Sequence, residues 1–161
     1  MKYGMVTLSV AEAKRLIAKG VAALPQVREA MKQQMIIVAR GTTNAYVAEE
    51  LTGLKIDKTR FTAGLICAGR CCVTAGATRL EPLVLKNGQS VPANWLEALD
   101  QMRHGDIFIK GGNALDREDN VGILLGRAGG GTIGSALGSL SARGIRSEER
   151  RVGKECRSRW S

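Results

Sequence analysis

The segment at residues 110–119, KGGNALDRED, places several chemically useful residue types close together. A carboxylate such as Glu118 or Asp116 could abstract a proton, and Lys110 could stabilise the oxyanion that forms. The alternative interpretation of the segment is a charged surface loop. If the segment forms a site, the residues after the lysine would hold the ligand there: Gly111, Gly112 and Asn113.

A second candidate is a glycine turn that follows the apolar run at residues 35–39. Glycine lets the backbone approach an anion, and the start of a following helix offers free N–H groups and a positive dipole. The sequence therefore predicts an anion-binding turn that consists of Gly41, Thr42, Thr43 and Asn44. The alternative is an ordinary strand-to-helix turn in which Thr43 or Asn44 caps the helix.

A third glycine segment, GGGTIG at residues 129–134, contains the spacing G-x-G-x-x-G. After a strand and before a helix, that spacing is typical of dinucleotide binding. The acidic residue expected about twenty positions later would fall near the end of the chain, which makes a nicotinamide or flavin cofactor the less favoured interpretation. We expect no cofactor, and instead a phosphate or CoA-like ligand on Gly129, Gly130, Gly131 and Thr132.

The cysteines favour core packing over a metal site. Cys67, Cys71 and Cys72 lie in apolar stretches without a nearby histidine, whereas a zinc site needs about four well-spaced ligands. We therefore predict reduced thiols and no metal. His104 is expected to be exposed at the end of a helix.

Alternating apolar patterns predict the elements that must position these residues. Ser9 and Glu12 form a capping box ahead of the first helix. Short apolar runs that alternate with helices indicate an α/β fold with three layers, in which a mostly parallel, Rossmann-like sheet has helices on both faces. Ligands would bind at the carboxyl ends of its strands, where all three glycine turns are expected. The predicted helices are residues 10–24, 26–32, 44–51, 94–102 and 133–140, and the predicted strands are residues 35–39, 83–85, 107–109 and 123–125.

Two of these motifs resemble the superfamily of ribose phosphate isomerase, glucosamine phosphate deaminase and CoA-transferases. IVARGTTNAYVA is similar to the phosphate-binding strand, turn and helix of the isomerases, and FIKGGNALDRED is similar to their catalytic segment. The resemblance implies that Gly41, Thr42 and Thr43 hold a phosphate. It also implies that Lys110 contacts substrate and that Glu118, after one residue is left out of the loop, is the general base. The aspartate-rich segment of the isomerases is not present at residues 104–106.

The last sixteen residues, RSEERRVGKECRSRWS, resemble the in-frame translation of a sequencing-library adapter. We therefore expect one α/β domain at residues 1–145, cut before its natural end, and a non-native tail at residues 146–161. The alternative is a basic tail that binds nucleic acid. The tail holds six of the 24 basic and three of the 15 acidic residues, so its loss would lower the net charge from +9 to +6.

Composition narrows the function classes. Aromatic residues make up only 4% of the chain, too few for base-stacking platforms, so nucleic acid is not an expected partner. No apolar run is long enough to cross a membrane, and the N-terminus lacks an apolar signal segment, which predicts a cytoplasmic protein without a membrane partner. The expected partner is a phosphorylated or CoA-like small molecule, and a homo-oligomer is left open.

Three functions remain open at this point. The first is an enzyme that is isomerase-like or transferase-like, with Glu118, Lys110 and Asp116 as catalytic residues. The second is a non-catalytic ligand-binding or regulatory module on the same fold. The third is an enzyme that binds a nucleotide cofactor through residues 129–134.

Overall fold

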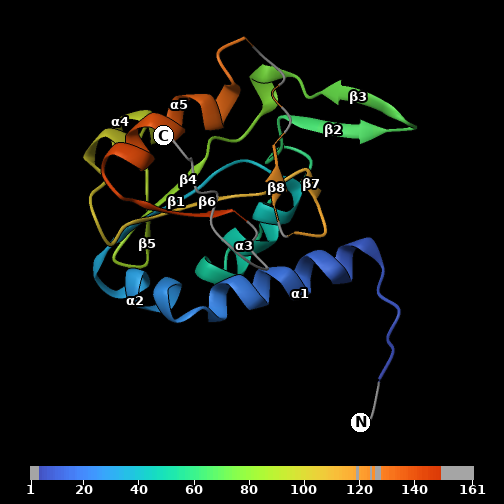
Figure 1. Ribbon diagram of the computed structural model, residues 1–161, viewed down its shortest axis with the longest axis horizontal. Helices are drawn as coiled ribbons and strands as arrows, with labels where there is room; N and C mark the ends of the chain where they lie inside the picture. The colour runs from blue at the N-terminus through green and yellow to red at the C-terminus, as the bar shows by residue number, and fades with distance from the viewer. Residues whose placement is uncertain (1–3, 119, 124, 126–127, 150–161) are drawn as a thin grey trace.

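A computed structural model describes residues 4–118, 120–123, 125 and 128–149. In this part of the chain, a five-stranded sheet lies between two layers of helices, and two small hairpins lie outside it (Figure 1). The helices are α1 (Val10–Ala23), α2 (Pro25–Gln33), α3 (Thr42–Thr52), α4 (Trp95–Gln101), α5 (Gly131–Ala142) and the 3₁₀ turn η1 (Gly76–Thr78). The sheet strands are β1 (Met35–Val38), β4 (Leu83–Lys86), β5 (Gln89–Val91), β6 (Ile107–Lys110) and β9 (Arg146–Glu149).

Local sequence signals account for the ends of several helices. At α1 the Ser9 N–H donates to Glu12 Oε2 at 2.7 Å, and the Glu12 N–H donates to Ser9 Oγ at 3.3 Å, which confirms the capping box. Pro25 opens α2, where its missing N–H costs nothing. Gly53 ends α3 with a φ of 71°, a conformation that glycine adopts without strain. The five predicted helices are all present, with ends shifted by one or two residues.

The sheet is mixed, which corrects the prediction of a mostly parallel, Rossmann-like sheet. Its strand order is β5-β4-β1-β6-β9. β1 and β6 are parallel, as are β6 and β9, but β4 runs antiparallel to both β1 and β5. For the pair β4–β5 the reason is the turn after β4, where Asn87 and Gly88 have φ values of 51° and 76°. A two-residue turn of this kind can only join antiparallel strands, so β5 folds back directly on β4.

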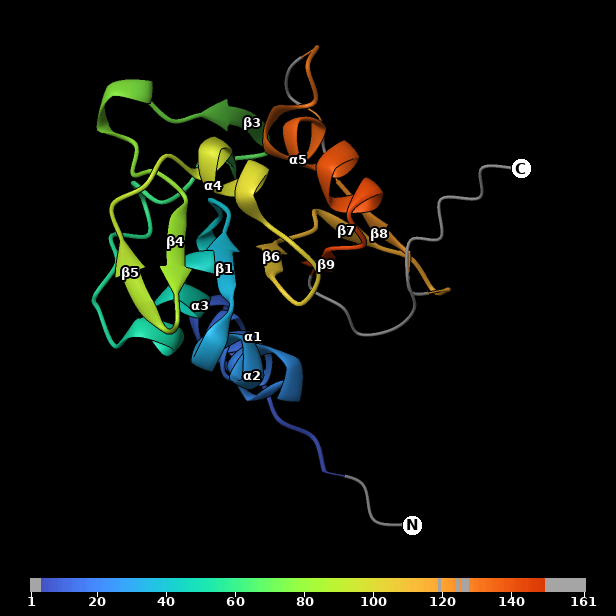
Figure 2. The same cartoon turned by 90° about the vertical axis from the view of Figure 1, so that its left-hand side faces the viewer.

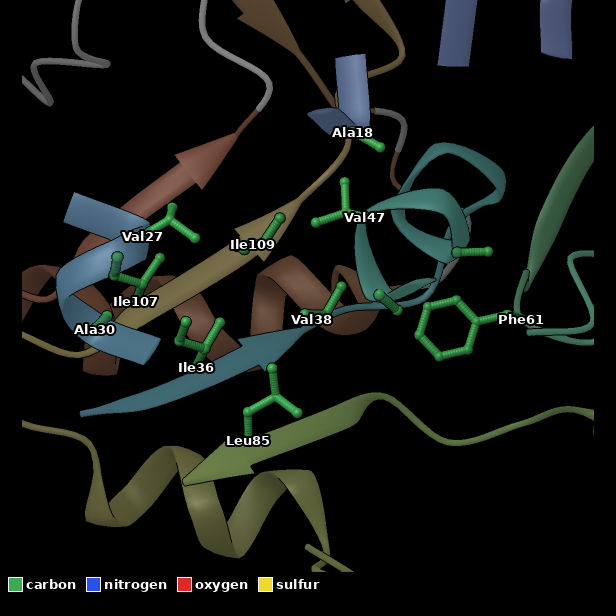
Figure 3. Packing of buried hydrophobic residues seen from close by; sticks show 12 residues of the cluster. Ala18, Val27, Ala30, Ile36, Val38, Val47, Phe61, Leu85, Ile107 and Ile109 are labelled. Atoms are coloured by element: carbon green, nitrogen blue, oxygen red, sulfur yellow. The ribbon is translucent and has the colours of Figure 1, made fainter. Parts of the chain in front are cut away.

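The strands of the sheet divide their side chains between two cores, as expected for three layers. Ile36 and Val38 of β1 face the helices α1, α2 and α3, and Ile107 and Ile109 of β6 join them (Figure 3). Ile37 of β1 faces the opposite way, toward α4 and α5, as does Phe108 of β6. All four residues of β1 are buried, because helices cover both faces of this central strand.

Two hairpins lie apart from the sheet. The first consists of β2 (Gly64–Cys67) and β3 (Arg70–Val73), and it projects from the body of the molecule in Figure 1. The second consists of β7 (Ala114–Leu115) and β8 (Val121–Gly122). A strand was expected at residues 123–125, but Ile123 and Leu125 are in no strand and Leu124 lies outside the described residues.

The segment that resembles a translated adapter begins inside the sheet. Ile145, which precedes it, is buried, and the backbone of its first four residues forms the edge strand β9 beside β6. Residues 150–161 lie outside the described part of the chain. None of the described helices is both long and apolar enough to cross a membrane.

Candidate functional site

The first two glycine turns lie next to each other at one edge of the sheet. β1 and β6 are parallel neighbours, so both strands end at the same edge. Gly111 follows β6 directly, and Gly41 follows β1 after Ala39 and Arg40. The pairing continues one residue past β1, because the Ala39 N–H donates to the Ile109 carbonyl oxygen at 2.8 Å. The first turn is held from its other side, where the Gly41 N–H donates to the Phe61 carbonyl oxygen at 2.8 Å. The edge therefore has the position that ligand sites occupy in α/β sheets.

The helix that starts at this edge has no side-chain cap. Gly41 is the N-cap residue of α3, and within the described part of the chain no side chain accepts a hydrogen bond from the first turn of this helix. The helices α1 and α4, by contrast, are capped by Ser9 and Asn94. Capping by Thr43 or Asn44, the alternative interpretation, is therefore not observed. The first-turn N–H groups and the positive end of the helix dipole are available to an anion.

Asn44 has a different role from the expected one. Its side chain is buried, with 3% exposed, and its Nδ2 donates to the carbonyl oxygens of Ala39 at 2.8 Å and Ile109 at 3.3 Å. The amide N–H groups expected to bind a ligand are thus used to join the ends of β1 and β6. This corrects its assignment as a donor to the ligand, because a side chain with both N–H groups engaged in the interior has none left to offer.

Two basic residues that the sequence analysis did not select lie beside the first turn. Lys14 of α1 donates from Nζ to Thr42 Oγ1 at 2.7 Å, which brings a cation to the first residue of α3. Arg40 precedes the turn, with its Nη2 at 3.6 Å from Glu81 Oε2. The Arg40 side chain is 17% exposed and that of Glu81 is 70% exposed. Lys14 is 28 residues from Thr42 in the sequence, so only the packing of α1 on α3 could reveal it.

The second turn lies between the end of β6 and the start of the hairpin β7–β8. Lys110 Nζ donates to the Gly111 carbonyl oxygen at 3.0 Å, and the Asn113 N–H donates to the Gly122 carbonyl oxygen at 2.8 Å. A Cβ at Gly112 would lie only 2.3 Å from Val121 Cγ1, so glycine is needed there for hairpin packing. Gly111 is the glycine that faces the first turn, since a Cβ there would lie 3.7 Å from Asn44 Oδ1.

The expected acid–base residues lie in the hairpin loop. Asp116 Oδ1 accepts from the N–H groups of Glu118 at 3.0 Å and Asn120 at 2.8 Å, and Oδ2 accepts from Asn120 Nδ2 at 2.7 Å. The hydrogen bonds from the Asn120 side chain and backbone lower the pKa of Asp116, which makes it a weaker base. Glu118 is exposed in the same loop, and Figure 2 shows this hairpin extending away from α3. Lys110 therefore lies at the site, whereas Asp116 has the role of a turn residue.

The third glycine segment starts α5 on the other face of the sheet. Gly130 has a φ of 71°, and a Cβ at Gly134 would lie 2.1 Å from the Gly129 carbonyl oxygen, so the glycines are needed by the loop itself. The loop follows the hairpin β7–β8 and not a strand of the central sheet, which the dinucleotide interpretation requires. Gly131 and Thr132 begin α5, which also has no side-chain cap in the described residues. Because α5 connects β6 to the parallel strand β9, its N-terminus points toward the same sheet edge as that of α3.

A charged cluster lies at the opposite end of α3. Arg15 donates to Glu49 and to Glu50, the latter at 2.8 Å, and Lys58 donates to Glu49. The Arg15 guanidinium and the Lys58 ammonium each lie 4.7 Å from the ring centre of Tyr46. A surface depression of about 400 Å³ is lined by Arg15, Glu49, Gly53, Leu54, Lys55 and Lys58. Since its partly exposed acids and bases pair with one another, we interpret this cluster as a structural link between α1, α3 and the following loop.

The cysteine predictions have a mixed outcome. Cys72 is exposed and free, which corrects its assignment to the core, because the hairpin β2–β3 projects from the body of the molecule (Figure 1). The side chains of Cys67 and Cys71 lie outside the described part of the structure, as does Cys156. His104 is exposed after α4, as predicted. The described residues contain no cluster of histidine, cysteine and acidic side chains that could hold a metal.

Comparison with known proteins adds no further assignment. Neither a family model, nor a curated protein, nor a solved structure matches this chain. What the fold and the site define is a mixed α/β protein with an uncapped helix N-terminus at the carboxyl ends of two parallel strands.

Proposed function

We propose that this protein binds a small molecule through an anionic group, such as a phosphate ester or the pyrophosphate of a CoA-like ligand, at the N-terminus of α3. The observation that carries the proposal is the uncapped first turn of α3 between the ends of β1 and β6. Lys14 adds a cation through its contact with Thr42. An anion placed there would accept hydrogen bonds from backbone N–H groups that are otherwise left to water.

The size of these interactions indicates what else the ligand must provide. An anion at a helix N-terminus gains roughly 0.3–1 kcal/mol, and up to about 2 kcal/mol in partly buried geometry. A neighbouring lysine adds an amount of the same order when the site is open to water. Together they support binding of a free phosphate only in the millimolar range or weaker, since 1 mM corresponds to about 4 kcal/mol. The remainder of a physiological ligand must therefore contact further surface near Gly111.

Titration with inorganic phosphate and with ribose 5-phosphate, followed by amide chemical shifts, tests the proposal. We expect the largest shift changes at the first-turn amides of Thr42 and Thr43, at constant ionic strength. The amide of Glu12, which is already bonded to Ser9 at the capped start of α1, is the internal control. Lys14→Gln should weaken the response several-fold. Equal changes at Glu12 and at Thr42, or no saturable change at Thr42, would reject the site.

Isomerase-like catalysis stays a prediction with less support than binding. It needs Glu118 at the bound ligand, and Glu118 is exposed in the hairpin loop that extends away from α3. The non-catalytic ligand-binding module is therefore the form of the proposal that the geometry favours. A cofactor-binding enzyme has the least support, because the loop at residues 129–134 follows a hairpin outside the central sheet.

A further inference from the structure

We propose that Asn44 is a positioning residue of the anion site, which holds the two glycine turns at a fixed separation. This inference rests on the proposed binding function and assigns to Asn44 a role that acts through the backbone. The side chain of Asn44 does not contact the ligand in this proposal. Its two carbonyl partners, Ala39 and Ile109, lie at the ends of β1 and β6, each two residues before the glycine of its turn.

The geometry explains why one side chain can control both turns. Asn44 lies in the first turn of α3, so its backbone belongs to the proposed anion cradle. Its Nδ2 donates to the carbonyl oxygen of Ala39, just after β1, at 2.8 Å. It also donates to the carbonyl oxygen of Ile109, on the neighbouring strand β6, at 3.3 Å. Its Oδ1 faces Gly111. A rotation of the helix start or a separation of the strand ends would therefore break at least one of these hydrogen bonds.

Loss of the Asn44 amide would affect the site more than the fold. Removing it takes one donor from each of the two carbonyl oxygens, of which that of Ile109 keeps the Ala39 N–H. At the strand ends water can enter and satisfy them, and the first turn of α3 then gains freedom. Because N–H donors bind an anion well only when their geometry is fixed in advance, affinity should fall.

The same two strands provide a matched control at their other ends. Asp106 is also 3% exposed, and it accepts from the Met35 N–H at the start of β1 and from the Arg103 N–H, both at 2.8 Å. Asn44→Ala and Asp106→Ala thus each remove one buried polar side chain that bonds to two backbone groups. They differ in which end of β1 and β6 they loosen.

The experiment compares thermal stability and phosphate affinity in the wild type and in both variants. Inorganic phosphate is the probe, and the amide shift of Thr42 is the readout. We expect both variants to melt at lower temperature, but only Asn44→Ala to lose about tenfold or more in affinity. Asn44→Ser, whose hydroxyl can donate one hydrogen bond where Asn44 donates two, should lie between wild type and Asn44→Ala and serves if Asn44→Ala fails to fold.

Two results overturn the inference while the proposed function survives. One is wild-type affinity in Asn44→Ala and Asn44→Ser, and the other is an equal loss of affinity in Asp106→Ala, which would indicate general loosening. A wild-type protein whose Thr42 amide does not respond to phosphate is a separate outcome, which rejects the proposed function and this inference together.

Discussion

Glu49 is the side chain on which three parts of the molecule meet. It accepts hydrogen bonds from Arg15 of α1, from Lys58, and from the Ile56 N–H at 3.0 Å. Burial alone would raise the pKa of Glu49, but the hydrogen bonds from Lys58, Ile56 and Arg15 outweigh it and lower the pKa to about 2. The ionised carboxylate is therefore favoured in the folded state, and its charge stabilises the fold.

Replacing Glu49 by glutamine should remove a pH-dependent part of the stability. Because the folded pKa is lower than the unfolded one, this stabilisation is fully present above about pH 4.5 and is lost as the pH falls toward 2. The shift sets an upper limit of about 3 kcal/mol, which water around the partly exposed Arg15 and Lys58 reduces. Denaturant unfolding of wild type and Glu49→Gln at several pH values should show a gap that closes on acidification. Glu29→Gln, in an exposed pair with Lys32, should match the wild type within about 0.5 kcal/mol. A gap that stays constant with pH would contradict this account.

At the scale of single residues, the sequence predicted types of side chain better than their partners. The turn with Gly41 could be found because glycine and helix-start residues follow an apolar run. The bonds of Asn44 and the approach of Lys14 could not, since both depend on how distant elements pack. The turn hydrogen bonds of Asp116 were not foreseen, because a carboxylate in a loop can serve as a base or as a turn residue that accepts backbone N–H groups.

Among the elements, the hairpin β4–β5 contributes both antiparallel pairings of the sheet. Its turn is fixed by Asn87 and Gly88, and the turn also packs against α2. A Cβ at Gly88 would lie 2.8 Å from the Met31 carbonyl oxygen, so the position excludes a side chain for steric as well as conformational reasons. Gly53 has a similar φ of 71° but open space around it.

This contrast predicts different costs for the same substitution. Gly53→Ala should destabilise by about 1 kcal/mol, the usual cost of a left-handed conformation for alanine. Gly88→Ala should cost at least about 1 kcal/mol more, because the backbone of α2 must also move. Urea unfolding of the two variants measures the difference. Equal costs would mean that the turn and α2 separate without penalty.

The elements were predictable where one local signal dominates. The strands β1, β4 and β6 are continuous apolar runs, and the helices have apolar residues at helical spacing, so their positions were confirmed. The strand β5 was missed because Gln89–Val91 is short and mostly exposed. The mostly parallel sheet was wrongly predicted because alternation of helices and strands was given more weight than the turn residues Asn87 and Gly88, which join antiparallel strands.

At the scale of the whole molecule, β9 closes one side of the sheet with polar residue types. Arg146–Glu149 pairs with β6 along its length, from Ile107 opposite Arg146 to Lys110 opposite Glu149. A polar sequence is tolerated there because an edge strand contributes mainly backbone hydrogen bonds. That residues 146–161 are a non-native tail stays a prediction. The first four residues of this predicted tail form β9 and so are part of the sheet.

Shortening the chain should separate the contribution of β9 to stability from that of the residues after it. A protein that ends at Glu149 should keep the stability of the full chain, whereas one that ends at Ile145 should lose on the order of 2 kcal/mol, since a few backbone hydrogen bonds at about 1 kcal/mol each disappear. The protein that ends at Ile145 should also self-associate through the newly open edge of β6. Thermal melting and size-exclusion chromatography test both. Identical melting of the two shortened proteins would show that β9 adds nothing to stability.

The central place of β1 has a consequence for how the protein is made. The four residues Met35–Val38 pair with β4 on one side and with β6 on the other, and both partners come later in the chain. A ribosome adds about 5–20 residues per second, so this apolar segment waits several seconds for Leu83–Lys86 and longer for Ile107–Lys110. During that interval the nascent chain exposes an apolar segment, and chaperones of the cell can bind to it.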